Sequence, residues 1–285
     1  MKTLRWIALF VVLLAYARGD SAPSAPIRVV SQTVGTDELL LALAEPEQIA
    51  ALSHLARDQD FSAVAVEASK YPQLVEGDAE TVLKYAPTLM LAANYSRREL
   101  VDQVRRAGVR VLIFDRYESI DDAYANLRRL ARELGPRAQA RAERVIADCQ
   151  RRMEFLRTKL RGVAPVRVIA PSTYGVIPGA DTTFEDLCAH AGAINLANTL
   201  GHLRGHEAPP NEQMLSWPID KVVLPGWSVE AALAPFRNLP PYKLMPAVRE
   251  GRVALIEPYM ISSVTHHRIE GYERLARELH PEVFR

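Results

Sequence analysis

Short hydrophobic runs and longer segments with helical periodicity alternate along most of the chain. The short runs predict β-strands at residues 27–30, 49–52, 88–92, 109–114, 166–170, 221–224 and 253–256. Hydrophobic positions three or four residues apart predict helices at residues 38–44, 81–85, 97–107, 183–191, 246–249 and 269–279. Strands that alternate with short helices are typical of parallel βαβ units, so the pattern predicts an α/β fold.

The alternation is interrupted in the middle of the chain. Residues 120–134 and 137–160 read as two consecutive helices separated by Gly135-Pro136. The second helix is amphipathic and would be about 36 Å long at 1.5 Å per residue, which is enough to span a domain. We therefore expect two βα lobes joined by one long backbone helix, with a ligand cleft between the lobes. The expected division is an N-terminal lobe at 27–136, an inter-lobe helix at 137–162 and a C-terminal lobe at 163–285.

The N-terminus has the features of a secretory signal peptide. Lys2 and Arg5 precede an apolar run at residues 6–15, and Ala15-Tyr16-Ala17 offers a small-residue cleavage site. The apolar run is too short to span a bilayer comfortably, and no cysteine near the cleavage site offers a lipid anchor. We expect a signal peptide at 1–17, a flexible leader at 18–26 and an exported mature protein.

Composition and motifs narrow the class of function. The formal net charge of the 285 residues is +1, which argues against a nucleic-acid partner because such proteins need a basic face. The sequence contains no G-x-x-x-x-G-K phosphate loop, no G-x-S-x-G elbow and no H-E-x-x-H motif, so we expect no enzymatic activity. A hydrolytic site assembled from the seven histidines and several acids stays open as an alternative. Cys149 and Cys188 are the only cysteines, and their spacing leaves a disulfide undecided.

Seven short segments occur in an order that resembles a known family. They are Gly35-Thr36-Asp37-Glu38, Ala50-Ala51-Leu52-Ser53, Pro87-Thr88-Leu89-Met90-Leu91, Ala107-Gly108-Val109-Arg110-Val111, Ala191-Gly192-Ala193-Ile194-Asn195, Asn211-Glu212-Gln213 and the segment 246–253. Together they resemble the periplasmic binding proteins for cobalamin, ferric siderophores and haem, whose lobes are joined by a rigid helix. The resemblance covers residues 27 to about 282.

The resemblance implies a periplasmic, monomeric carrier with no intrinsic cofactor. Such a protein captures a metal chelate (cobalamin, a ferric siderophore or haem) and delivers it to the permease and ATPase of an ABC importer. In the cobalamin-binding member, one acidic residue on each lobe docks onto the transporter. The matching positions here are Glu99 and Glu212, and paired carboxylates on two lobes suit two arginine pockets.

Aromatic and histidine residues after the predicted strands are the candidate ligand contacts. Aromatic side chains at strand-to-loop junctions suit a flat, apolar, metal-bearing ligand. Neutral imidazole suits iron and cobalt, so histidines near the cleft are candidate axial ligands. The aromatic candidates are Tyr95, Tyr174, Trp227 and Tyr259, and the histidine candidates are His54, His266 and His267.

Two departures from the family pattern bear on which chelate is bound. Haem-binding relatives tend to carry Gly-Tyr before the Ala-Glu segment, whereas here Asp78-Ala79-Glu80 is preceded by Pro72-Gln73-Leu74, and Tyr71 stands just outside the expected place. The N-terminal half also lacks a cluster of exposed arginines that could be assigned to a catecholate siderophore. Arg97 and Arg98 could bind one, but they are explained equally well as ordinary charges on a helix surface.

A binding protein for a bare zinc or manganese ion is the second alternative. That class needs several histidines and carboxylates that converge on one ion. His190, His202 and His206 lie around Gly201 and Gly205 in a segment that could form such a site.

Overall fold

The computed structural model describes residues 26–285. The predicted signal peptide and all but the last residue of the predicted leader lie outside the described residues. Within residues 26–285, none of the helices combines the length and the apolar character that crossing a membrane requires.

The N-terminal lobe is built on a five-stranded, all-parallel sheet with the strand order β3-β2-β1-β4-β5. Its central strand β1 is fully buried because it has a neighbour on each side and helices on both faces. The strands are β1 (Val29–Ser31), β2 (Ile49–Ser53), β3 (Leu74–Val75), β4 (Leu89–Ala93) and β5 (Arg110–Phe114).

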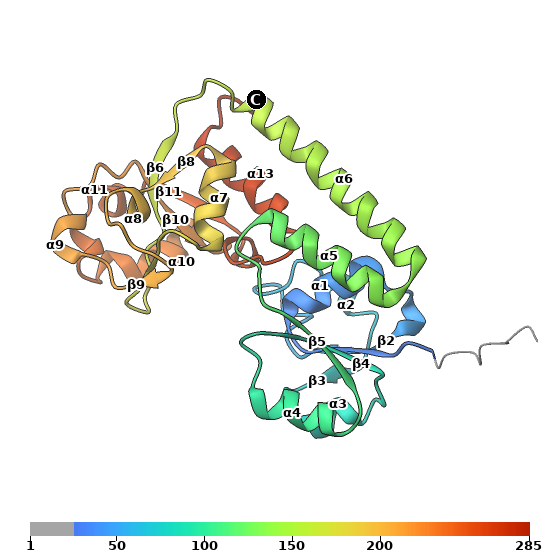
Figure 1. The fold of residues 1–285 in the computed structure, drawn as a ribbon. Coiled ribbons are helices and arrows are strands. Elements are labelled where there is room, and N and C mark those ends of the chain that lie inside the picture. The colour runs from blue at the N-terminus through green and yellow to red at the C-terminus, as the bar shows by residue number, and fades with distance from the viewer. Residues whose placement is uncertain (1–25) are drawn as a thin grey trace, which may run out of the picture.

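Alternate residues of these strands pack into two separate hydrophobic cores. Leu89 and Leu91 of β4 join the core beneath α1 and α5, whereas Met90 and Ala92 join the core beneath α3 and α4. This period of two is what a strand buried on both faces produces. Figure 1 shows α3 and α4 on one side of the sheet, with α1 and α5 between the other side and α6. The helices are α1 (Val34–Leu43), α2 (Ala65–Ala68), α3 (Ala79–Leu83), α4 (Arg98–Arg106) and α5 (Ile120–Leu134), with a 3₁₀ turn η1 (Pro46–Gln48).

The long helix α6 (Pro136–Lys159) packs against both lobes. A proline at its first position fits the helix start, and Gly135 before it adopts φ 109°, which favours glycine and separates α5 from α6. Its buried stripe faces α1 and α5 in the N-terminal lobe and α7 and α13 in the C-terminal lobe. The buried residues of this stripe are Ala138, Ala142, Ile146, Cys149 and Leu156.

The C-terminal lobe contains a second parallel sheet, with the strand order β11-β10-β6-β8. Helices α7 (Thr183–Ala191) and α13 (Arg268–Leu279) pack together on one face, and their core is continuous with that of α6. The strands are β6 (Val166–Ile169), β8 (Ala193–Asn195), β10 (Lys221–Pro225) and β11 (Val253–Ile256), and a separate antiparallel pair joins β7 (Ile177–Pro178) to β9 (His206–Glu207). The remaining elements are α8 (Leu196–Thr199), α9 (Asn211–Met214), α10 (Val229–Leu233), η2 (Ala234–Arg237), η3 (Tyr242–Leu244), α11 (Pro246–Arg249) and α12 (Pro258–Ile261).

The expected α/β fold is confirmed: each of the two lobes has a parallel sheet, and one long helix connects the lobes. Helices α5, α7 and α11 and strand β11 have the bounds that periodicity predicted. The short strands β7, β8 and β9 were not predicted, because two or three residues carry too little periodicity.

Candidate functional site

Loops after the strands of the N-terminal lobe form one half of a cleft. Gln32 follows β1, His54 follows β2 and Tyr95 follows β4, so all three lie at the carboxyl edge of the sheet, where open α/β sheets bind ligands. Together with Phe61 they line a cavity of about 350 Å³, which we call the N-lobe pocket. Residues 262–264 complete its wall from the C-terminal half of the chain.

The loop after β6, together with the end of β10, α10 and η2, forms a second cavity of about 530 Å³ that we call the C-lobe pocket. Tyr174 projects from the loop after β6 and is 91% exposed. His206 and Phe236 also line this pocket. Ser262 lines both pockets, so the two pockets adjoin, and we refer to them together as the inter-lobe cleft.

A hydrogen bond between the side chains of Trp227 and Asp60 joins the two lobes beside this cleft. The indole Nε1–H of Trp227 donates to Asp60 Oδ1 at 2.7 Å. Asp60 precedes Phe61 of the N-lobe pocket, and Trp227 lies two residues after Pro225 of the C-lobe pocket. Trp227 is therefore a neighbour of the cleft and lines neither pocket.

The cleft is aromatic and carries little charge. Neither pocket is lined by an arginine or a lysine, and the ionisable side chains other than tyrosine that line them are Glu38, His54 and His206. Burial raises the pKa of Tyr95, so its phenol stays neutral at physiological pH. The cleft therefore suits a ligand with a large apolar surface.

Glu38 is a buried carboxyl group at the floor of the N-lobe pocket and connects the two halves of the chain. Its Oε1 accepts the Ala63 main-chain N–H at 3.0 Å, and its Oε2 accepts the Thr265 hydroxyl at 2.5 Å. Burial raises the pKa of Glu38, and the charge of His267 and the Thr265 hydrogen bond offset this only in part.

Asp37 is fully buried directly behind Glu38. Its Oδ1 accepts the Ser53 main-chain N–H at 3.0 Å, and its Oδ2 accepts the Ser53 hydroxyl. Burial raises the pKa of Asp37 to about 7, even though hydrogen bonds from Ser31 and Ser53 lower it. The start of α1 therefore places two carboxyl groups of raised pKa next to the cleft.

Three of the predicted ligand contacts point elsewhere. The Tyr259 hydroxyl donates to Glu270 Oε2 at 3.1 Å, and His267 Nδ1 lies 2.8 Å from Glu270 Oε1. His266 and His267 face α6, where they line a cavity with Cys149 and Arg152, and neither lines the cleft pockets. Both imidazoles lie against α6 and outside the cleft pockets, and this placement does not support their prediction as axial ligands.

The imidazoles of this pair differ in environment. Burial lowers the pKa of His266 to about 3, and its Nδ1 has no hydrogen-bond partner within residues 26–285. Burial alone would also lower the pKa of His267, but the hydrogen bond to Glu270 and the charge of Glu38 raise it. His267 therefore belongs to a buried ion-pair network.

The histidines proposed for a bare metal ion do not converge. His190 stacks on Tyr272 with ring centroids 4.6 Å apart, while His206 lines the C-lobe pocket. The part of the chain described here contains no group of three or more His, Cys, Asp or Glu side chains that could hold a metal ion. Cys149 and Cys188 are both buried free thiols.

The two predicted docking carboxylates lie on separate lobes. Glu99 is in the first turn of α4 and Glu212 in the first turn of α9, and both are exposed. Among residues 26–285, neither forms a salt bridge. Helices α4 and α9 lie far from α6 in their respective lobes (Figure 1).

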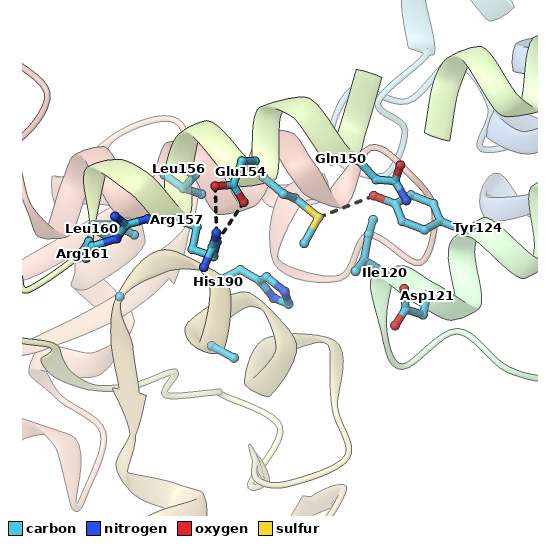
Figure 2. A pocket seen from close by; sticks show the side chains of 13 residues that line it. Ile120, Asp121, Tyr124, Gln150, Glu154, Leu156, Arg157, Leu160, Arg161 and His190 are labelled. Atoms are coloured by element: carbon cyan, nitrogen blue, oxygen red, sulfur yellow. Dashed lines mark hydrogen bonds and ion pairs between the residues drawn. The ribbon is translucent and has the colours of Figure 1, made fainter. Parts of the chain in front are cut away.

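A further cavity of about 690 Å³ lies between α5, α6 and α7, and it shares no lining residue with the cleft pockets. Figure 2 shows Arg157 paired with Glu154 on α6, with His190 of α7 below them. Tyr124 of α5 donates to the sulfur of Met153 at 3.5 Å. Glu154, Arg157 and Tyr124, which line this cavity, are thus already engaged with other side chains.

Sequence reasoning identified His54, Tyr95 and Tyr174, which line the cleft, but missed Phe61, Phe236, Gln32, Glu38 and Ser263. Phe61 and Phe236 lie outside strand ends, in a loop and a 3₁₀ turn, so no periodicity marked them. Glu38 was read only as part of a family-like segment.

Comparison with known proteins places this architecture in a family. The periplasmic binding protein family matches residues 29–260, while a comparison with curated proteins gave no match. The apo form of the periplasmic heme-binding protein RhuT from Roseiflexus sp. RS-1 is 20% identical, with 91% of this chain and 100% of that chain covered and a TM-score of 0.73. The periplasmic heme-binding protein BhuT in complex with two hemes is also 20% identical, with 91% and 100% covered and a TM-score of 0.75. The periplasmic heme-binding protein HutB of Vibrio cholerae is 19% identical, with 90% and 99% covered and a TM-score of 0.72. The family match covers most of the chain, and the chain belongs to the periplasmic binding protein family.

Proposed function

We propose that this protein is the extracytoplasmic substrate-binding component of an ABC importer and that it carries a tetrapyrrole metal chelate, with haem as the first candidate. The observation that carries the proposal is the pair of aromatic-lined pockets that adjoin at Ser262. Phe61 and Tyr95 line one pocket, and Tyr174 and Phe236 line the other. A flat macrocycle that enters between them covers aromatic surface on both sides.

The charge of the cleft favours a tetrapyrrole over a catecholate siderophore. A ferric catecholate is strongly anionic and would need arginine or lysine partners, and neither pocket is lined by either residue. A tetrapyrrole has a mainly apolar face and carries its polar groups on its edge. The names of the three structural relatives support haem in particular. Cobalamin is the alternative ligand, and a titration with both compounds distinguishes it from haem.

Two histidines on opposite lobes are available to the metal of such a ligand. His54 lines the N-lobe pocket and His206 lines the C-lobe pocket, and both are exposed. Exposed neutral imidazole is a good ligand for iron and cobalt, so we assign His54 as the first candidate and His206 as the second. These two replace His266 and His267, which face α6.

Delivery would use the two exposed carboxylates. Glu99 and Glu212 carry one negative charge on each lobe and would contact basic pockets of the permease, whose ATPase drives uptake. The protein would act as a periplasmic monomer. Because α6 packs on both lobes, the two carboxylates would keep nearly the same separation with and without ligand.

A hemin titration of cleft variants tests the proposal. Replacing Tyr95 or Tyr174 by Ala should weaken hemin binding about tenfold, because each removes one aromatic wall. Replacing His54 by Ala should also shift the Soret band of the complex. His202→Asn is the matched control, since His202 is exposed outside both pockets and its φ of 54° suits Asn. Binding unaffected by all three cleft substitutions would contradict the proposed site.

A further inference from the structure

Two buried polar atoms at the floor of the N-lobe pocket have no hydrogen-bond partner. Ser263 is 8% exposed and lines the pocket, and its Oγ is unpaired within residues 26–285. The Oε1 atom of Gln32, which also lines the pocket, is buried and unpaired in the same part of the chain. Buried polar atoms in folded proteins nearly always have a partner, so these two atoms leave an unused acceptor and an unused hydroxyl at the floor of the pocket.

The first turn of α1 adds main-chain donors to the same pocket. Val34 and Gly35 both line it, and neither main-chain N–H donates a hydrogen bond within the described residues. The Thr33 side chain is already used, since it caps the N–H of Thr36. The first amides of a helix are free donors unless something caps them.

A glycine holds this helix start close to Ser263. A Cβ atom at Gly35 would lie only 2.6 Å from Val264 Cγ2, so a larger residue would push α1 away from the segment 262–265. The close approach places the amide donors and the Ser263 hydroxyl around one small polar floor.

The charges around this floor decide which ligand group it accepts. Glu38 lines it, Asp37 lies behind it, and no arginine or lysine lines the pocket. A carboxylate there would meet no arginine or lysine among the lining residues and would lie beside the Glu38 carboxyl group, which disfavours a second negative charge. A neutral group with both a donor and an acceptor instead matches Gln32 Oε1, the free amides and the Ser263 hydroxyl.

We propose that the floor formed by Gln32, the first turn of α1 and Ser263 is a subsite for a neutral hydrogen-bonding arm of the ligand, such as a carboxamide or hydroxyl. This inference rests on the proposed function and adds to it a preference for ligands with a neutral arm over ligands with a carboxylate at this position. The subsite selects tetrapyrroles with amidated or hydroxylated edges over those that present a carboxylate to the floor. Free carboxylates of a bound macrocycle are then directed away from α1.

A matched pair of iron porphyrins tests the subsite. Hemin and hemin bisamide share the macrocycle and the metal and differ only in whether the two edge arms are carboxylates or carboxamides. We expect the wild-type protein to bind the bisamide about tenfold more tightly in a Soret titration. Ser263→Ala and Gln32→Leu should each reduce this preference at least threefold, and far-UV circular dichroism and the thermal midpoint show separately that the variants fold. Ser262→Ala is the control, because Ser262 lines the cleft but is exposed to water.

The outcomes separate this inference from the proposed function. Equal binding of the two porphyrins by the wild type overturns the subsite and leaves the proposed function intact. A preference that persists in both Ser263→Ala and Gln32→Leu also overturns the subsite, since another part of the cleft then produces it. If neither porphyrin binds and cobalamin does not bind either, the proposed function fails and the subsite fails with it.

Discussion

The indole Nε1–H of Trp227 and the carboxylate of Asp60, 167 residues apart in the sequence, form a 2.7 Å hydrogen bond that links the two lobes. Both side chains are exposed, and Trp227 is 59% exposed. Phe61, next to Asp60, lines the N-lobe pocket. A ligand that widens the cleft at this point must break the bond, so the pair is placed to influence how fast ligand enters and leaves.

Removing this bond should change ligand kinetics more than stability. Trp227→Phe keeps an aromatic ring and loses the N–H donor. A solvent-exposed neutral-to-charged hydrogen bond contributes on the order of 1 kcal/mol, so we expect ligand dissociation up to about fivefold faster and little change in the thermal midpoint. Stopped-flow displacement of bound hemin measures the rate.

Asp60 provides the matched controls for this prediction. Asp60→Asn keeps an acceptor for the indole and should behave like the wild type, whereas Asp60→Ala should behave like Trp227→Phe. Identical dissociation rates in all four proteins would show that the bond plays no part in ligand release.

Glu38 should contribute strongly to stability because it joins distant parts of the chain. Its replacement by Ala leaves the Ala63 N–H and the Thr265 hydroxyl without their buried acceptor. Each unsatisfied buried donor costs about 1–3 kcal/mol, so we expect a loss of about 3 kcal/mol in the free energy of unfolding. Glu38→Gln keeps one acceptor and should lose less. Urea denaturation measures both, and equal stability of Glu38→Ala and the wild type would refute the bridging role.

The buried Asp37 predicts a specific pH dependence of stability. Its pKa is raised from 3.8 to about 7 by burial, so the folded protein holds a proton there that the unfolded chain has lost. Its contribution to the free energy of unfolding is therefore complete below about pH 4 and declines as the pH rises to about 7. The difference over this range is up to about 4 kcal/mol, at 1.36 kcal/mol per pKa unit.

His266 has the opposite effect and must be separated from Asp37. Its pKa is lowered from 6.5 to about 3, so its contribution is complete above about pH 6.5 and is lost as the pH falls towards 3. The wild-type stability curve should therefore be flatter than either contribution alone. Asp37→Asn removes only the first contribution, so relative to the wild type it should gain stability as the pH rises from 4 to 7. Parallel wild-type and Asp37→Asn curves in urea denaturation would contradict the raised pKa.

The docking proposal predicts loss of transport without loss of ligand binding. Glu99→Lys and Glu212→Lys each reverse one exposed charge, and we expect each to reduce uptake at least tenfold because a basic pocket of the permease would then be repelled. Proteoliposomes that contain the cognate permease and ATPase provide the measurement, and a hemin titration checks that affinity is unchanged. Glu47→Lys is the control, since Glu47 is also exposed but lies in η1, outside α4 and α9. Full uptake with both substitutions combined would refute this assignment.

The fold was largely predictable because it depends on local patterns. The amphipathic stripe of α6 and the Gly135-Pro136 break could be read directly from the sequence, as could the apolar runs of β4 and β5. Strand β8 could not, because its three residues become a strand only by pairing with β6.

The candidate site was predictable where a side chain directly follows a strand. His54 and Tyr95 follow β2 and β4, and the parallel sheet brings them to one edge. His266 follows no strand directly, and the turn before α13 sets its direction, which no local pattern reveals. Ser263 and Gln32 come together only when the C-terminal half folds back on α1, so spacing in the sequence could not pair them.

The most direct test of the account is a visible absorption and tryptophan-quenching titration of the purified ligand-free protein with hemin, cobalamin, a ferric catecholate siderophore and zinc. The proposed function predicts submicromolar binding of at least one of the two tetrapyrroles, and no comparable binding of the siderophore or of zinc. Tight binding of zinc or of the siderophore, with neither tetrapyrrole bound, would contradict it.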